Sequence, residues 1–395
     1  MKKAVTDSIF YVGANDYDID LFEGQYEVPN GMAYNSYVIM DEKIAVMDTI
    51  DQRKTDVWLS QLAEVFGDRT PDYLVVQHME PDHSASIGAF LAQYPTAVVV
   101  GTAKTFAMIQ QFFPTMEMPK TMAVKEGDTL SLGIHILHFV MAPMVHWPEV
   151  MVSYEATEKI LFSADAFGKF GALDAEEDWL DEARRYFIGI VGKYGKPVQT
   201  LLKKAAALDI AKICPLHGPV LEDNLGYYVD LYRKWSSYEP EEKGTCVFYT
   251  SVYGHTEAAV ELLVQKMLDE GVPMVVMMDL ARCDMAEAVA NAFAFDQCVL
   301  ATTTYNGDIF PFMKEFITHL TERNFQNRKV AFMENGSWAP TATKTMKKLL
   351  EASADLTFAN QEVTILSAVN DAAEDAIAAL AKEMAKAYQD EKAAE

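Results

Sequence analysis

The run from Gln77 to His83 carries four side chains that can bind a metal ion: His78, Glu80, Asp82 and His83. It follows the apolar segment 73–76, so it should lie on a loop at the carboxyl end of a strand. His78, Glu80 and Asp82 alternate, and in an extended segment they would face one side. His83 would then face elsewhere, where a folded loop could present it to a second ion. One such residue would be an ordinary solvated loop residue, but four after a buried strand predict a metal site.

Three further candidate ligands each follow another apolar segment, and they are His146, Asp165 and His217. Each alone could be a core or turn residue, but together they complete a set of seven. Glu80, Asp82 and Asp165 with a bridging hydroxide would balance the charge of two divalent ions, and the two oxygens of Asp165 suit a bridge. Because the set holds nitrogen and oxygen donors without a thiolate, it suits iron or manganese as well as zinc.

A second kind of site is predicted after the apolar segment 245–249, where a hydroxyl-rich loop leads into a helix. Backbone N–H groups and the helix dipole attract a phosphate there, with Ser251 and Thr256 adding hydroxyls. No Lys follows Gly254 and no Gly-x-Gly-x-x-Gly occurs, which disfavours a nucleoside triphosphate or a dinucleotide. A capped helix start is the alternative. The residues assigned to this loop are Thr250, Ser251, Val252, Tyr253, Gly254, His255 and Thr256.

Two later loops should lie at the same edge, because carboxyl ends of parallel strands meet there and open α/β sheets bind ligands at that edge. Tyr305 and Trp338 could stack on an isoalloxazine ring, and the pattern is similar to flavodoxin with FMN as cofactor. The residues assigned to these loops are Thr302, Thr303, Thr304, Tyr305, Asn306, Gly307, Asn335, Gly336, Ser337 and Trp338.

Two α/β domains are expected to position these residues. The polar stretch 236–243 is interpreted as a linker, giving domains 1–243 and 244–395. The second domain should be a five-stranded doubly wound parallel sheet, since its strands and amphipathic helices alternate. Its expected strands are 245–249, 274–280, 297–303, 329–333 and 363–366, with helices at 255–270, 284–292, 311–323, 342–353 and 371–388. In the first domain, strands are expected at 9–12, 37–40, 44–47, 73–77, 97–100, 134–141, 150–154 and 159–163.

Composition excludes several classes of protein. The 58 acidic and 33 basic side chains among 395 residues give a formal charge of −25, which argues against nucleic acid and an anionic membrane as partners. No apolar run reaches the roughly 18–20 residues of a membrane span. Neither a signal peptide nor a disulfide framework is expected, because the start lacks an apolar stretch and the four cysteines are scattered. We therefore expect a cytoplasmic protein.

The sequence resembles the flavodiiron proteins, in which a metallo-β-lactamase-like αββα sandwich precedes a flavodoxin-like domain. The resemblance rests on His-x-Glu-x-Asp-His at 78–83 with separate His146, Asp165 and His217. It implies one iron on His78, Glu80 and His146, and a second on Asp82, His83 and His217, with Asp165 as the bridge. Glu80 stands where the related hydrolases typically have His, which favours iron over zinc.

The resemblance also implies an activity and partners. Family members reduce dioxygen to water or nitric oxide to nitrous oxide, with electrons passing from an external donor to FMN and then to the diiron site. Because the chain has no rubredoxin module or NAD site, a separate donor such as rubredoxin is required. Family membership further implies a head-to-tail homodimer, or a tetramer, in which the flavin of one chain faces the irons of the other.

Some assignments stay open at this stage. Tyr194 matches a tyrosine near the family's substrate pocket, but it could equally be a plain loop residue. Glu23 stands where several relatives carry a pocket histidine. A dinuclear zinc hydrolase with a flavodoxin-like accessory domain is one alternative function, and an electron carrier with a structural metal is another. His135, His138 and His319 are interpreted as packing or surface residues.

Overall fold

The computed structural model describes residues 3–394 and divides into two compact units, Met1–Ser236 and Ser237–Glu395. Helix α7 (Leu225–Ser237) ends the first unit, and strand β17 (Glu242–Tyr249) starts the second. The domain limit after residue 243 remains a sequence prediction. Across the described chain we find no helix with the length and apolarity that crossing a membrane requires.

The first unit contains two main sheets that share one core. Met47 and Val75 of one sheet lie in the same buried cluster as Phe139 and Phe162 of the other. The first sheet has the order β1 (Lys3–Ala4), β2 (Ile9–Tyr11), β7 (Tyr37–Ile39), β8 (Ala45–Met47), β9 (Tyr73–Val75), β10 (Val98–Gly101) and β11 (Thr121–Ala123). The second has the order β12 (Thr129–Ser131), β13 (Ile136–Met141), β14 (Met151–Glu155), β15 (Ile160–Phe162) and β16 (Lys212–Cys214). Two short pairs complete the strands, β3 (Ala14–Asp16) with β6 (Met32–Tyr34) and β4 (Leu21–Phe22) with β5 (Tyr26–Glu27).

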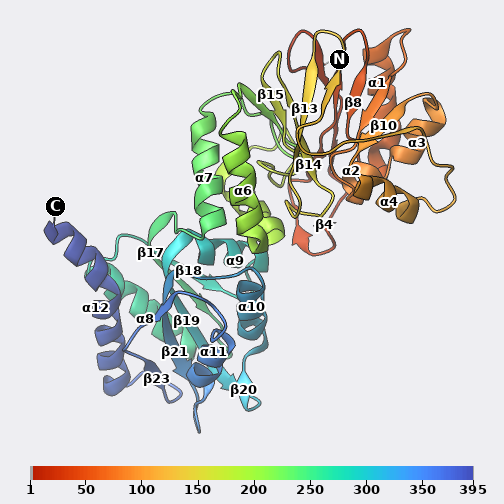
Figure 1. Cartoon of the computed structure of the whole chain (residues 1–395). Helices are drawn as coiled ribbons and strands as arrows, with labels where there is room; N and C mark the ends of the chain where they lie inside the picture. The colour runs from red at the N-terminus through yellow and green to blue at the C-terminus, as the bar shows by residue number, and fades with distance from the viewer. Residues whose placement is uncertain (1–2, 395) are drawn as a thin grey trace. The chain divides into compact units, whose positions relative to one another are not determined.

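Helices cover both outer faces of this sandwich. In Figure 1, α1 (Thr55–Phe66), α3 (Ile87–Gln93) and α4 (Ala103–Phe112) lie beside the first sheet. Helix α6 (Gly195–Ala205) and helix α7 lie on the side of the second sheet. The short α2 (Pro81–Ser84) and α5 (Trp179–Tyr186) belong to the connections. The arrangement confirms the predicted αββα layers.

The second unit is a doubly wound parallel sheet, as predicted. Its order is β18 (Val275–Asp279), β17, β19 (Phe295–Tyr305), β21 (Arg328–Asn335) and β22 (Leu356–Phe358). Strand β23 (Val363–Ile365) also pairs with β21, so two short strands share the fifth position, and β20 (Asp308–Ile309) pairs antiparallel with β19. The helices are α8 (His255–Asp269), α9 (Met285–Ala294), α10 (Pro311–Glu322), α11 (Ala342–Leu349) and α12 (Asp371–Ala394). Glu395, the last residue of the predicted terminal helix, lies outside the described residues.

Parallel pairing places the chemistry-bearing loops at common edges. In the first unit β8 pairs in parallel with β9, and β15 with β16, so the loops after their carboxyl ends lie together. In the second unit β17, β19 and β21 are adjacent and parallel, and the three predicted flavin loops follow them. The sequence-distant candidates therefore meet because of strand direction.

Candidate functional site

One cluster of metal-binding side chains joins the loop after β9 to the loops after β13 and β15. Nε2 of His78 lies 3.3 Å from Nε2 of His146, and Glu80 Oε2 lies 2.9 Å from the latter nitrogen. Oδ2 of Asp165 is 3.1 Å from His78 Nε2 and 3.2 Å from His146 Nε2. Two imidazoles and two carboxylates thus converge on one small volume.

A second cluster lies on the other side of Asp165. Nε2 of His83 and Nε2 of His217 are 3.0 Å apart, and Asp82 Oδ2 lies 3.2 and 3.1 Å from them. Oδ1 of Asp165 is 3.2 Å from His83 Nε2 and 3.7 Å from His217 Nε2. Asp165 therefore turns one oxygen to each cluster, and the seven residues divide in the way the resemblance implies.

The structure corrects one step of the sequence argument. His78, Glu80 and Asp82 do not face one side of an extended segment, because Pro81 begins the helical turn α2 after Glu80. That turn rotates Asp82 away from Glu80 and groups it with His83 and His217. Proline suits the first helical position because its fixed φ matches the helix. It has no N–H, and an N–H at this position would have no partner within the helix.

The two clusters fit a pair of cations. Both oxygens of Asp165 and of Asp82 are buried and accept no hydrogen bond from any described residue. Buried carboxylate oxygens without donors are costly, as are facing imidazole nitrogens in contact, and a cation between them satisfies both. The residues present therefore match the donor set of a dinuclear nitrogen–oxygen metal centre.

The carboxylates give both clusters a preference for positive charge, which the imidazole protons supply when no metal ion is bound. Burial opposes the charged form of His83, but the Asp82 and Asp165 carboxylates outweigh burial and raise the pKa of that imidazole to about 10. The same balance, with Asp165 and Glu80 as partners, raises the pKa of His146 to about 9. The Asp165 carboxyl pKa is held well below its usual range by the surrounding imidazoles, although burial opposes this. Metal binding would displace these imidazole protons.

Two buried carboxylates beside the clusters were not found from the sequence. Asp48 accepts hydrogen bonds from the backbone N–H groups of Gln77 and His78, at 2.7 and 3.3 Å, and so fixes the loop. Burial raises the pKa of Asp48 to about 6, although the hydrogen bonds oppose the rise. Glu149 accepts from Nδ1 of His78 at 2.9 Å. Asp48 follows an apolar strand, as Asp165 does, which is the only signal that could have found it.

A cavity of about 240 Å³ adjoins the clusters. Glu80 and Asp82 lie in its wall together with Glu23, which stands in the turn of the β4–β5 hairpin. Desolvation and the negative charge of Glu80 raise the pKa of Glu23 to about 7. Tyr194 ends the turn before α6 and does not line this cavity. The catalytic role of Tyr194 stays a prediction.

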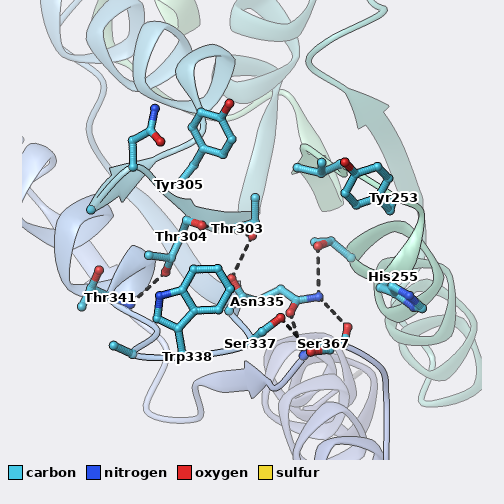
Figure 2. Close-up of a pocket in the computed structure, with 16 residues that line it drawn as sticks. Tyr253, His255, Thr303, Thr304, Tyr305, Asn335, Ser337, Trp338, Thr341 and Ser367 are labelled. Carbon is cyan, nitrogen blue, oxygen red and sulfur yellow. Dashed lines mark hydrogen bonds between the residues drawn. The ribbon is translucent and has the colours of Figure 1, made fainter.

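The flavin loops of the second unit surround a cavity of about 650 Å³, within the range of cofactor sites. Tyr253 and Trp338 lie on opposite sides of it (Figure 2) and are 90% and 82% exposed, so their ring faces are available for stacking. Most of the predicted residues line the cavity: Val252, Tyr253, His255, Thr256, Thr303, Thr304, Tyr305, Asn306, Gly307, Asn335, Gly336, Ser337 and Trp338.

Four predicted residues, Thr250, Ser251, Gly254 and Thr302, do not line this cavity. Thr250 and Thr302 are buried and hydrogen-bond to each other through their hydroxyls at 2.6 Å. Ser251 accepts from the backbone N–H of Gly254 at 3.0 Å and shapes the loop before α8. The N–H groups at the start of that helix, with the hydroxyl of Thr256, fit the phosphate of FMN.

Asn335 connects the three predicted loops to a fourth, and its carbonyl accepts from the Thr303 hydroxyl of the second loop at 3.0 Å. Its Nδ2 donates to Thr256 Oγ1 at 3.3 Å and to the carbonyl of Ser367 at 3.0 Å, and its Oδ1 accepts from the Ser367 N–H at 3.1 Å (Figure 2). Ala339, Thr341 and Ser367 also line the cavity and were not predicted. Ser367 directly follows the strand expected at 363–366, so its position was the available signal.

Two family models match the chain. Residues 32–218 match the ODP family beta lactamase, and residues 246–367 match the flavodoxin domain. The anaerobic nitric oxide reductase flavorubredoxin of Salmonella arizonae is 28% identical over 364 residues, which cover 89% of this chain and 75% of that protein.

Solved structures match nearly the whole chain. Rubredoxin oxygen:oxidoreductase from Desulfovibrio gigas superposes with a TM-score of 0.90 at 25% identity, covering 98% of this chain and 99% of that one. The flavodiiron protein from Giardia intestinalis also gives a TM-score of 0.90, at 23% identity over 99% and 98% of the two chains, and this shows the fold. The chain therefore shares with flavodiiron proteins a beta-lactamase-like domain followed by a flavodoxin domain, and it is an oxidoreductase whose metallo-β-lactamase-like domain serves a diiron centre and whose flavodoxin domain serves FMN.

Proposed function

We propose that the chain reduces dioxygen to water, nitric oxide to nitrous oxide, or both, with electrons from a separate donor protein. The observation that carries this proposal is the position of Asp165, whose two oxygens face two separate trios of nitrogen and oxygen donors. The names of two relatives, a nitric oxide reductase and an oxygen oxidoreductase, support both substrates.

The seven side chains have defined tasks in this proposal. His78, Glu80 and His146 would hold one iron, Asp82, His83 and His217 would hold the other, and Asp165, with one oxygen toward each trio, would be shared between them. When bound, FMN stores two electrons and exchanges them singly, while the iron pair offers the positions at which a small gas is reduced. Phe22 and Tyr186 lie against the His217 ring, with centroids 5.4 and 5.5 Å away, and keep bulk water from that side.

A dinuclear hydrolase is not favoured. Glu80 supplies a carboxylate to the first trio, which makes the site harder and more anionic than one with a further imidazole. A chain that holds two zinc ions and no iron after expression in iron-replete medium would overturn the oxidoreductase proposal. An electron carrier with a structural metal would instead bind iron but consume neither gas when reduced.

The main test is a gas-specific reoxidation experiment. The protein is reduced without oxygen and mixed with dioxygen or nitric oxide in turn, while flavin absorbance is followed. Fast reoxidation by one gas identifies the substrate, and Asp165→Ala should abolish it. Equal and slow reoxidation by both gases would count against a specialised reductase.

We also propose that rubredoxin or a similar small redox protein is the donor, and that two chains pair head to tail so that electrons cross between them. Mixed dimers test the pairing: one chain carries Asp165→Ala and the other Asn335→Ala. Transfer between chains predicts recovered activity on mixing, whereas transfer within one chain predicts none. The four cysteines are free, which supports a cytoplasmic location.

A further inference from the structure

Glu149 is a buried carboxylate that contacts the metal cluster from outside. It follows His146 by three residues, lies two residues before the start of β14, and is 1% exposed. Its Oε1 accepts from Nδ1 of His78 at 2.9 Å and from the backbone N–H of Met79, also at 2.9 Å. One carboxylate oxygen thus holds both the ring and the backbone of the loop that carries His78.

The imidazoles of the second cluster have no such partner. Nδ1 of His217 donates to the backbone carbonyl of Ala33 at 2.7 Å, which is a neutral acceptor. Nδ1 of His83 is buried and has no hydrogen-bond partner within residues 3–394. The hydrogen bonds behind these imidazoles are therefore unequal, because only that of His78 is to a carboxylate.

Glu149 also changes the net charge of the metal site. Glu80, Asp82, Asp165 and a bridging hydroxide would already offset two divalent ions. Glu149 brings a further negative charge, and its Oε2 is buried with no hydrogen-bond partner in the described chain. A carboxylate that accepts the outer N–H of a metal-binding imidazole fixes the ring's tautomer and orientation and raises its basicity.

We propose that Glu149 is a positioning residue that makes the two metal positions unequal. It holds Nε2 of His78 toward the first position and strengthens that nitrogen as a donor, so this position binds its ion more tightly and favours a higher charge on it. The inference rests on the metal ligands proposed above. It concerns the division of affinity between the positions and not the gas that is reduced.

Metal titration of the Glu149→Gln variant tests the proposal. The amide keeps the size of the side chain and can still accept from His78, but it removes the charge. Ferrous iron is added without oxygen to metal-free protein in competition with a chelator. We expect one of the two binding constants to fall by about 10–100-fold, as for other outer partners of metal ligands, and the other to stay unchanged. An equal fall in both constants, or no fall in either, would overturn the proposal.

A matched control comes from the strand that follows Glu149. Glu155, the last residue of β14, is also fully buried and accepts backbone N–H groups from Ile136, Thr157 and Glu158, and none of these hydrogen bonds involves a metal-binding side chain. Glu155→Gln should leave both iron constants unchanged even if it destabilises the fold. A loss of iron in this control equal to that in Glu149→Gln would assign the effect to general destabilisation and overturn the proposal.

Mössbauer spectra of the iron-loaded protein give a second measurement. These spectra would not change if Glu149 served only to stabilise the fold. The wild-type chain should show two distinct iron environments, which become more alike in Glu149→Gln and are restored in Glu149→Asp. If Glu149→Gln does not fold, Glu149→Asp decides, since its retained charge should keep the two environments distinct, and merged environments would overturn the proposal. A wild-type chain that binds two ions but reduces neither gas would reject the proposed function and leave these binding results valid.

Discussion

The metal clusters and the flavin cavity differ in how far their polar groups are removed from solvent. Six of the seven metal-binding candidates are buried, and all seven are ionisable side chains held against one another. The flavin cavity is formed mainly by hydroxyl, amide and backbone groups, with exposed aromatic rings at its sides. A pair of bound cations would offset the free-energy cost of burying several charged side chains. A flavin instead needs a shaped and mostly neutral surface that stays open to an electron donor.

The largest expected effect tests the independence of the two sites. Among the seven candidate ligands, Asp165 alone faces both trios, so Asp165→Ala should weaken iron binding by at least about 100-fold, given that loss of an outer partner alone costs about 10–100-fold. FMN should remain bound. Elemental analysis and flavin absorbance give the ratio of iron to FMN, with Asp209→Ala as an exposed control. If both cofactors stay in place, the bridge assignment is wrong.

A substitution in the flavin site should have the opposite effect, with loss of FMN and retention of iron. Asn335→Ala removes hydrogen bonds to Thr256 and Ser367, which hold two of the flavin loops together. Losing such contacts costs about 1–3 kcal/mol, so FMN should bind roughly 10–100-fold more weakly while iron is retained. Fluorescence titration of the flavin measures this, and Asn360→Ala on the surface is the control. Unchanged FMN affinity would remove Asn335 from the site.

The same contrast explains which parts could be predicted from the sequence. His, Asp and Glu after apolar strands are chemically conspicuous, so all seven candidates of the metal clusters were identified before their geometry was known. Their division between two positions depended on the turn at Pro81, which alternation in the sequence did not reveal. Asp48 and Glu149 were missed because a single carboxylate in a loop has no pattern, and only the tertiary fold brings it to an imidazole.

The fold was predicted well where strands are apolar and flanked by turns. Strands such as β8, β15 and β17 are found where they were expected. The short β22 was missed because three residues at 356–358 are too few to give a periodic pattern, and their pairing with β21 comes from tertiary structure. Ser367 was missed for a related reason, since its backbone rather than its residue type contacts Asn335.

A smaller effect concerns the exposed rings of the flavin cavity. Trp338 is 82% exposed, so its removal should not destabilise the unit. If it stacks on the flavin, Trp338→Ala should weaken FMN binding by about 3–10-fold, and Trp338→Phe should restore most of the loss, since an aromatic pair contributes about 0.5–1.5 kcal/mol. Quenching of flavin fluorescence reports the stacking. Equal affinities for the Ala variant and the wild-type chain would mean that Trp338 serves a different contact.

The smallest expected effect concerns a third cluster of His, Asp and Glu side chains, around His135. We expect this cluster, unlike the two metal clusters, to need no metal ion. His135 lies just before β13 and is buried, instead of lying on the strand as expected. Its Nδ1 is 2.8 Å from Asp41 Oδ2, and its Nε2 is 3.2 Å from Glu158 Oε1 and 3.0 Å from Ser8 Oγ. Although burial opposes it, the hydrogen bonds to Asp41 and Glu158, with the charge of nearby Glu155, raise the pKa of His135.

These shifts fix the pH range in which the cluster stabilises the fold. Because the His135 pKa is raised, its contribution is present below the ordinary value of about 6.5 and is lost as pH rises through the folded value. Although burial opposes it, hydrogen bonds from His135 and from backbone N–H groups lower the pKa of Asp41. Hydrogen bonds from Ser8 and His135 lower the pKa of Glu158 in the same way. The stabilisation that these two carboxylates contribute is therefore lost as pH falls through their lowered pKa values. The contribution should therefore be largest between about pH 4.3 and 6.5.

Thermal unfolding of His135→Gln against the wild-type chain measures this contribution across pH. We expect a difference of about 1–3 kcal/mol in that range, because hydrogen bonds to charged groups contribute about that much, and a smaller difference at pH 9. A chelator should lower the melting temperature of both proteins equally, since the imidazolium itself supplies the positive charge in this cluster. A difference that does not change with pH would mean that His135 acts through packing alone, and one abolished by the chelator would tie it to the metal clusters.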